Sequence, residues 1–82
     1  WFNARQLLSR AILDERTKRL CMIAAFAALK SHEHLKFMIS GSLKNGVAKE
    51  EIKEILFYCG IYAGQEATLQ AFDIYRKCIA SA

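Results

Sequence analysis

The spacing of apolar residues along this chain follows the period of an α-helix. Leucine, isoleucine, alanine and aromatic residues recur three and four positions apart, and no stretch alternates polar and apolar residues for long enough to predict a strand. Proline is absent, so glycine marks the breaks between segments. We therefore expect an all-α chain whose 82 residues form a single domain over residues 1–82.

Five helices joined by short loops are expected, as a small bundle. Their approximate bounds are residues 3–12, 15–29, 31–44, 48–63 and 65–79. Asp14 and Ser31 are suitable N-caps for the second and third helices. Gly46 is expected to end the third helix, with Val47 as its hydrophobic follower. Gly41 lies inside that helix, where a close approach of another helix would explain it.

The second helix contains an apolar run, residues 20–29, that has no polar face. Ten residues are too few to cross a bilayer, which needs roughly 20, so no membrane span is expected. A helix that is apolar all round needs cover on every side. Hydrophobic residues make up 54% of this short chain, against a usual ~45–50%. We therefore expect copies of the chain to associate and cover one another.

The charged and sulfur-containing residues exclude several function classes. The net charge is +4, but positive and negative residues alternate, so no nucleic-acid partner is expected. The cysteines, Cys21, Cys59 and Cys78, form no close pair and lie in apolar stretches, which indicates buried, reduced thiols in the cytoplasm. His32 and His34 have no cysteine nearby in sequence, so a structural zinc site is not expected. No cofactor is expected either.

Three segments in order resemble one known family. They are LDERTKRL at residues 13–20, LKNGVAKEEIKEIL at 43–56 and IYAGQEA at 61–67. Together they resemble the carboxymuconolactone decarboxylase family, which includes the alkyl hydroperoxidase D-like proteins. The resemblance covers residues 13–79 and implies an all-helical subunit that assembles as a trimer or hexamer.

The resemblance also implies one of two chemistries. One branch decarboxylates a lactone of aromatic-compound catabolism, using a histidine in the third helix. The other branch reduces peroxides with that histidine, a Cys-x-x-Cys pair and a glutamate on the second helix.

Counting back from Asn45-Gly46 places the family's functional positions on this chain. The histidine position falls on Met38, the two cysteine positions on Ser31 and His34, and the glutamate position on Arg19. A thioether does not carry protons as an imidazole does, and serine with histidine has no dithiol chemistry. Peroxidase activity is therefore not expected.

The candidate catalytic residues are His34, Glu33 and His32, at the start of the third helix. Free N–H groups there attract anions, and His34 lies one turn before Met38 on the same side of the helix. Decarboxylation needs a proton donor and groups that stabilise a developing enolate. The alternative is that the histidines are solvated surface residues near Lys36.

Other side chains offer weaker candidates. Tyr58 and Tyr62 lie one turn apart, and either line a pocket as donors or pack as aromatic side chains. Lys30, Lys36 and Lys44 either attract an acidic substrate or are solvated.

Two hypotheses remain open. The chain is a decarboxylase-like lyase acting on a small carboxylated lactone or related acid, as the resemblance favours. Alternatively, it is a catalytically degenerate oligomeric binding or scaffold subunit, because Met38 occupies the family's histidine position.

Overall fold

The computed structural model describes residues 12–81. Helices are the only regular elements in that range, which confirms the all-α prediction. The expected helix at residues 3–12 lies almost entirely outside the described residues. The four described helices are α2 Glu15–Ala28, α3 His32–Lys44, α4 Lys49–Ala63 and α5 Gln65–Ser81.

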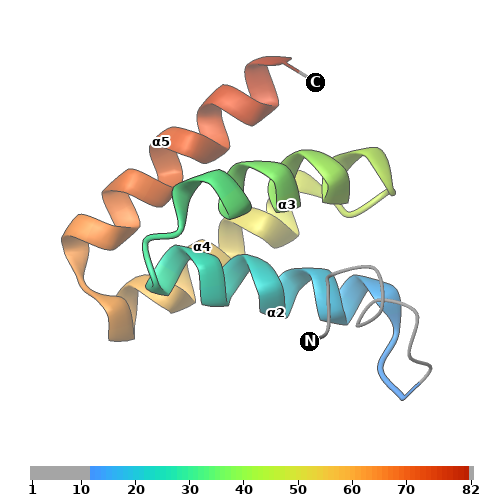
Figure 1. The fold of residues 1–82 in the computed structure, drawn as a ribbon, viewed down its shortest axis with the longest axis horizontal. Coiled ribbons are helices and arrows are strands. Elements are labelled where there is room, and N and C mark those ends of the chain that lie inside the picture. The colour runs from blue at the N-terminus through green and yellow to red at the C-terminus, as the bar shows by residue number, and fades with distance from the viewer. Residues whose placement is uncertain (1–11, 82) are drawn as a thin grey trace.

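The four helices pack in a ring around one core. Helix α2 packs on both α3 and α4, and α5 also packs on both of these helices (Figure 1). Figure 1 shows α3 in front of α4, with α2 and α5 below and above them. The largest fully buried apolar side chains are Ile23, Leu35, Ile39, Ile52 and Leu56. Helix α3 therefore has one side towards α2 and another towards α5.

The helix ends follow the capping signals in the sequence. Asp14 accepts a 2.7 Å hydrogen bond from the Thr17 amide, which lowers the pKa of its carboxyl. Gly46 has a φ of +87° and is followed by buried Val47, as predicted. Gly64, at +98°, ends α4. Ser31 occupies the N-cap position of α3, but its side chain makes no cap hydrogen bond.

The apolar run of α2 is only partly covered within residues 12–81. Ile23 and Ala27 are buried, whereas Cys21, Ala25 and Leu29 are exposed. The prediction of buried cysteines is wrong for Cys21 and holds fully only for Cys78, because Cys21 faces away from the bundle. All three thiols are free, as predicted.

Within residues 12–81, no helix combines the length and the apolar character that crossing a membrane requires.

Of the two glycines inside helices, Gly60 rather than Gly41 lies at a close approach to a neighbouring helix. A Cβ added to Gly60 would overlap Thr68 Oγ1 and lie 3.1 Å from Thr68 Cγ2. At Gly41 an added Cβ would lie 3.4 Å from Arg19 Nη1, which is close to ordinary contact. The absence of a side chain at Gly60 therefore lets α5 lie directly against α4.

We expect Gly60→Ala to lower the free energy of unfolding by about 1–3 kcal/mol, because overpacking outweighs the gain in helix propensity. Urea denaturation measures this change. Gly41→Ala is the matched control, and should be neutral or stabilise by up to about 1 kcal/mol. Adding Thr68→Ala to Gly60→Ala should recover part of the loss. An undiminished unfolding free energy in Gly60→Ala alone would contradict this account of the α4–α5 contact.

Candidate functional site

The start of α3 carries the histidines singled out in the sequence. Ser31 Oγ lies 2.8 Å from His34 Nδ1, so the hydroxyl that could have capped the helix is engaged with the imidazole instead. The His34 ring also stacks on Phe26 of α2, with centroids 5.1 Å apart and planes 24° apart. His34 is exposed but held in place by these two contacts. If Ser31 donates, Nδ1 accepts and Nε2 carries the proton.

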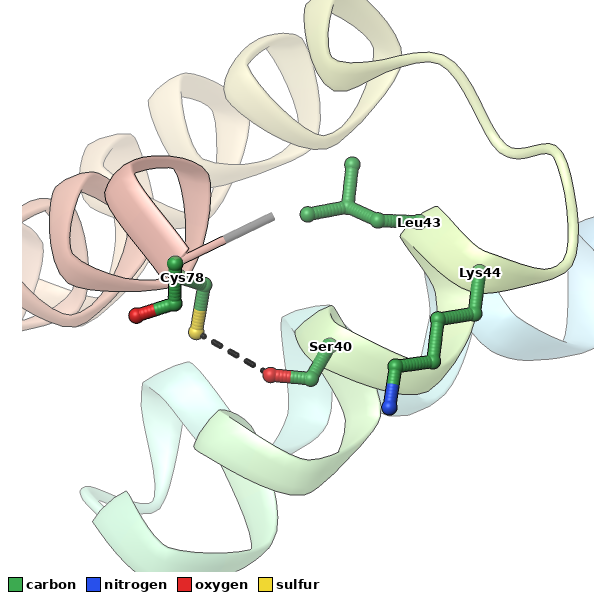
Figure 2. Close-up of a pocket in the computed structure, with 5 residues that line it drawn as sticks. Ser40, Leu43, Lys44 and Cys78 are labelled. Carbon is green, nitrogen blue, oxygen red and sulfur yellow. Dashed lines mark hydrogen bonds between the residues drawn. The ribbon is translucent and has the colours of Figure 1, made fainter.

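Two adjoining cavities lie between α3 and α5. One has a volume of about 360 Å³ and is lined by Ser40, Leu43, Lys44, Cys78 and Ser81. Figure 2 shows Ser40 and Cys78 pointing toward each other across it, with Ser40 Oγ 3.5 Å from Cys78 Sγ. The second, of about 300 Å³, shares three of these residues and extends to the start of α3. We call the two together the α3–α5 groove.

The second cavity joins two of the three predicted catalytic residues. His32, Glu33 and Lys36 line it from α3, and Lys77 lines it from α5. His34 is not among the lining residues, because it faces Phe26 on the α2 side of the helix. The structure thus groups His32 with Glu33 and places His34 apart from them.

The groove carries more positive than negative charge. Among residues 12–81, three lysines line it, Lys36, Lys44 and Lys77, together with one acidic residue, Glu33. Lys77 Nζ lies 3.1 Å from Asp73 Oδ2, so Lys36 and Lys44 are the better cations for a ligand. A concave, partly apolar site with a few convergent polar groups suits a small organic anion.

Sequence reasoning did not predict Ser40, Cys78 or Lys77 as lining residues. A signal for part of this set was present, because His32, Lys36, Ser40 and Lys44 recur every four positions and so form one stripe along α3. Which helix would face that stripe depends on the packing of α5, which residue spacing does not specify.

Arg19 on α2 and Met38 on α3, which stand where the resemblance places the family's glutamate and histidine, are in contact. Arg19 Nη1 lies 3.9 Å from the thioether sulfur of buried Met38. A second N–H group of Arg19, on Nη2, bonds to Glu15 Oε1 at 3.1 Å. The two side chains are in contact, but a guanidinium and a thioether offer no proton transfer at neutral pH.

The three cysteines form no disulfide with one another. Their free thiols come from different helices. Desolvation raises the pKa of the Cys59 thiol, whose sulfur lies 3.5 Å from the Ala24 carbonyl oxygen. Burial therefore disfavours the nucleophilic thiolate there. Within residues 12–81, no three histidine, cysteine or acidic side chains gather closely enough to hold a metal ion.

Tyr58 and Tyr62, the two tyrosines singled out in the sequence, lie on the surface of the bundle. Tyr58 is 59% exposed and Tyr62 is 91% exposed, so neither side chain is packed within residues 12–81 of a single copy. Tyr62 borders a shallow apolar hollow with Ala24, Ala28 and Cys59. Tyr58 and Tyr62 are exposed because α2 and α5 pack on the other sides of α4 and leave the side with these tyrosines uncovered.

Comparison with known proteins agrees with the sequence motifs. Residues 2–77 match the carboxymuconolactone decarboxylase family. The chain is also similar to a 4-carboxymuconolactone decarboxylase of Acinetobacter baylyi, with 35% identity over 69 residues. That alignment covers 84% of this chain and 52% of the relative, so the chain spans about half the length of the relative it matches. The chain belongs to the carboxymuconolactone decarboxylase family.

Proposed function

We propose that this protein is a lyase that decarboxylates a small carboxylated lactone or a related acid of aromatic-compound catabolism. The observation that carries the proposal is the α3–α5 groove, where His32 and Lys36 line the same cavity. Family membership supports the reaction class. The charge of the groove supports an acidic substrate.

The groups in the groove match the needs of a decarboxylation. When the bond between the carboxyl carbon and the lactone ring breaks, CO₂ leaves and the electron pair moves through the unsaturated ring onto the lactone carbonyl. Lys36 and Lys44 stabilise the oxyanion that develops there and bind remaining carboxylate groups. His32, protonated, then delivers a proton to the ring carbon.

His34 is the other candidate proton donor, and the two histidines are separable by experiment. We expect His32→Gln to lower kcat for carboxymuconolactone by about 10²–10⁴-fold, the usual contribution of a positioned general acid. His34→Gln, and likewise His34→Ala, should leave kcat within about threefold, because this ring faces Phe26 rather than the groove. The loss of ultraviolet absorbance by the lactone measures turnover.

Each outcome of that experiment has a defined meaning. Loss of turnover in His34→Gln, with His32→Gln unaffected, moves the proton-donor role to His34 and removes the groove from the mechanism. Absence of turnover by the parent protein removes carboxymuconolactone as substrate. Lys36→Met should raise KM more than it lowers kcat, because the charge it removes binds the substrate in the ground state as well as in the transition state.

The second candidate function is a non-catalytic binding or scaffold subunit. The contact between Arg19 and Met38 favours it, because the family's proton-transfer pair is replaced by groups that do not transfer protons. In that case the groove would bind a small acid without converting it. Calorimetric binding of the lactone without turnover would support this second function.

We also infer that copies of this chain assemble, as a trimer or hexamer if they follow the family resemblance, in the cytoplasm. Support comes from an apolar face made by Phe57, Tyr58, Ile61, Tyr62 and Leu69, which are each more than half exposed. A monomeric protein rarely exposes so many large apolar side chains together. The three free thiols suit a reducing compartment.

A further inference from the structure

Arg19 is a cation whose side chain is mostly, but not fully, buried, and its Nε donor makes no hydrogen bond among residues 12–81. Its side chain is 11% exposed, and it lies on the side of α3 that faces α2, away from the α3–α5 groove. Nη1 points to the sulfur of Met38, and Nη2 bonds to one oxygen of Glu15. Nε is buried and finds no hydrogen-bond partner among residues 12–81. A guanidinium has five N–H donors, and these two contacts use only two of them.

The two contacts that Arg19 does make are weak ones. A thioether sulfur is a poor acceptor, and 3.9 Å is long for a hydrogen bond to it. Glu15 is 55% exposed and stands one turn earlier on the same helix, an arrangement that contributes little to stability. Structures seldom leave a buried charged donor unsatisfied without a reason.

The geometry of the guanidinium shows which ligand would use these donors. Nε and Nη2 donate from the same edge, and this edge matches the two oxygens of a carboxylate in a pair of parallel hydrogen bonds. Glu15 occupies only the Nη2 half of that edge, with a single oxygen, Oε1. Nη1 is directed elsewhere, towards Met38. An incoming carboxylate that replaced Glu15 would therefore gain the Nε hydrogen bond that Glu15 does not make.

We propose that the Nε–Nη2 edge of Arg19 is a binding site for the carboxylate of a small organic acid, which displaces Glu15 from it. This site goes beyond the proposed function, because it lies across α3 from the groove and requires no turnover. Arg19 acts here as a binding residue and moves no proton.

The experiment follows thermal unfolding of the full chain in increasing sodium succinate, with ionic strength held constant by sodium chloride. A ligand that binds only the folded state raises Tm with concentration. We expect a saturable rise in the parent protein. Arg19→Gln should lose this rise. Arg76→Gln, which removes the same charge from an exposed position on α5, should keep it.

Two further variants test the displacement of Glu15. Glu15→Gln removes the competing charge, so the succinate concentration at half-maximal effect should fall about fivefold. Arg19→Lys keeps the charge but loses the two-donor edge, so that concentration should rise about tenfold. Arg19→Lys also serves if Arg19→Gln fails to fold. A structural ion pair alone would give no tightening in Glu15→Gln.

Binding in the α3–α5 groove is distinguished by Lys36→Met, which should keep the succinate effect at Arg19. The proposal is overturned if Arg19→Gln and Arg19→Lys respond to succinate as the parent does. It is also overturned if Lys36→Met alone abolishes the response, because the acid would then bind in the groove. The same holds if the parent shows no rise beyond that in sodium chloride. None of these outcomes depends on whether His32 catalyses a reaction.

Discussion

Leu56→Ala is expected to lower the free energy of unfolding by about 2–5 kcal/mol, the usual cost of this change in a packed core. Leu56 is 1% exposed on α4, the helix that packs against both α2 and α5. Removing its branched end leaves a cavity that three rigid helices close only in part. Since small domains are stable by only about 5–15 kcal/mol, this one truncation takes a large share of the total.

Urea denaturation followed by far-ultraviolet circular dichroism measures this loss. Leu29→Ala is the matched control, because Leu29 follows α2 and is 75% exposed. It should change the unfolding free energy by no more than about 0.5 kcal/mol. Equal effects of the two substitutions would show that the core is not centred where Leu56 lies. An unfolded Leu56→Ala protein at room temperature agrees with the expectation.

The helices could be predicted from sequence because their signals are local. Asp14 caps α2 through a residue three positions away, and Gly46 and Gly64 adopt the positive φ angles that end α3 and α4. These effects need no knowledge of the partner helix. The start of α4 shows the limit, because Ala48 has no capping side chain and only Glu51 Oε1 accepts from the Ala48 amide, at 3.2 Å.

The candidate site was less predictable because it depends on which helices meet. The cluster of His32, Glu33 and His34 is local, but the packing of α5 decides that His32 lies in a cavity and the contact with Phe26 turns His34 away from it. The apolar stretch around Cys78 predicts a buried residue, and Cys78 is buried. It also lines the groove, which the stretch does not predict. The spacing of apolar residues predicts that one face of a helix is covered, but it does not predict which helix covers that face.

Arg19 shows the same limit of prediction from sequence. Counting residues aligned Arg19 and Met38 with two functional positions of the family, and the structure brings those two side chains together. The count could not show that Nε of the arginine would be buried without a partner. That property follows from the side chains of two helices together, and it is the basis for the carboxylate site.

The apolar face of α4 and α5 gives the second large expected effect. We expect Ile61→Lys to convert the assembled protein into monomers at micromolar concentration. Ile61 is 69% exposed, and on α4 it lies one turn after the exposed Phe57 and one turn or less from Tyr58 and Tyr62. Its five side chains expose on the order of 500 Å² of apolar surface, near the upper end for a monomer and approaching the ~800 Å² per partner of a stable interface. A lysine there would have to leave water without a partner for its charge.

Size-exclusion chromatography with light scattering measures the mass of the parent and the variant. Ala80→Lys adds the same charge to an exposed position of α5 outside the face and should leave the mass unchanged. Both variants should retain the helical circular dichroism of the parent, because neither position is buried in the single chain. A parent that is already monomeric at high micromolar concentration would remove the assembly proposal. An Ile61→Lys protein that keeps the parent's mass would move the interface elsewhere, towards the exposed Ala25 and Leu29 of α2.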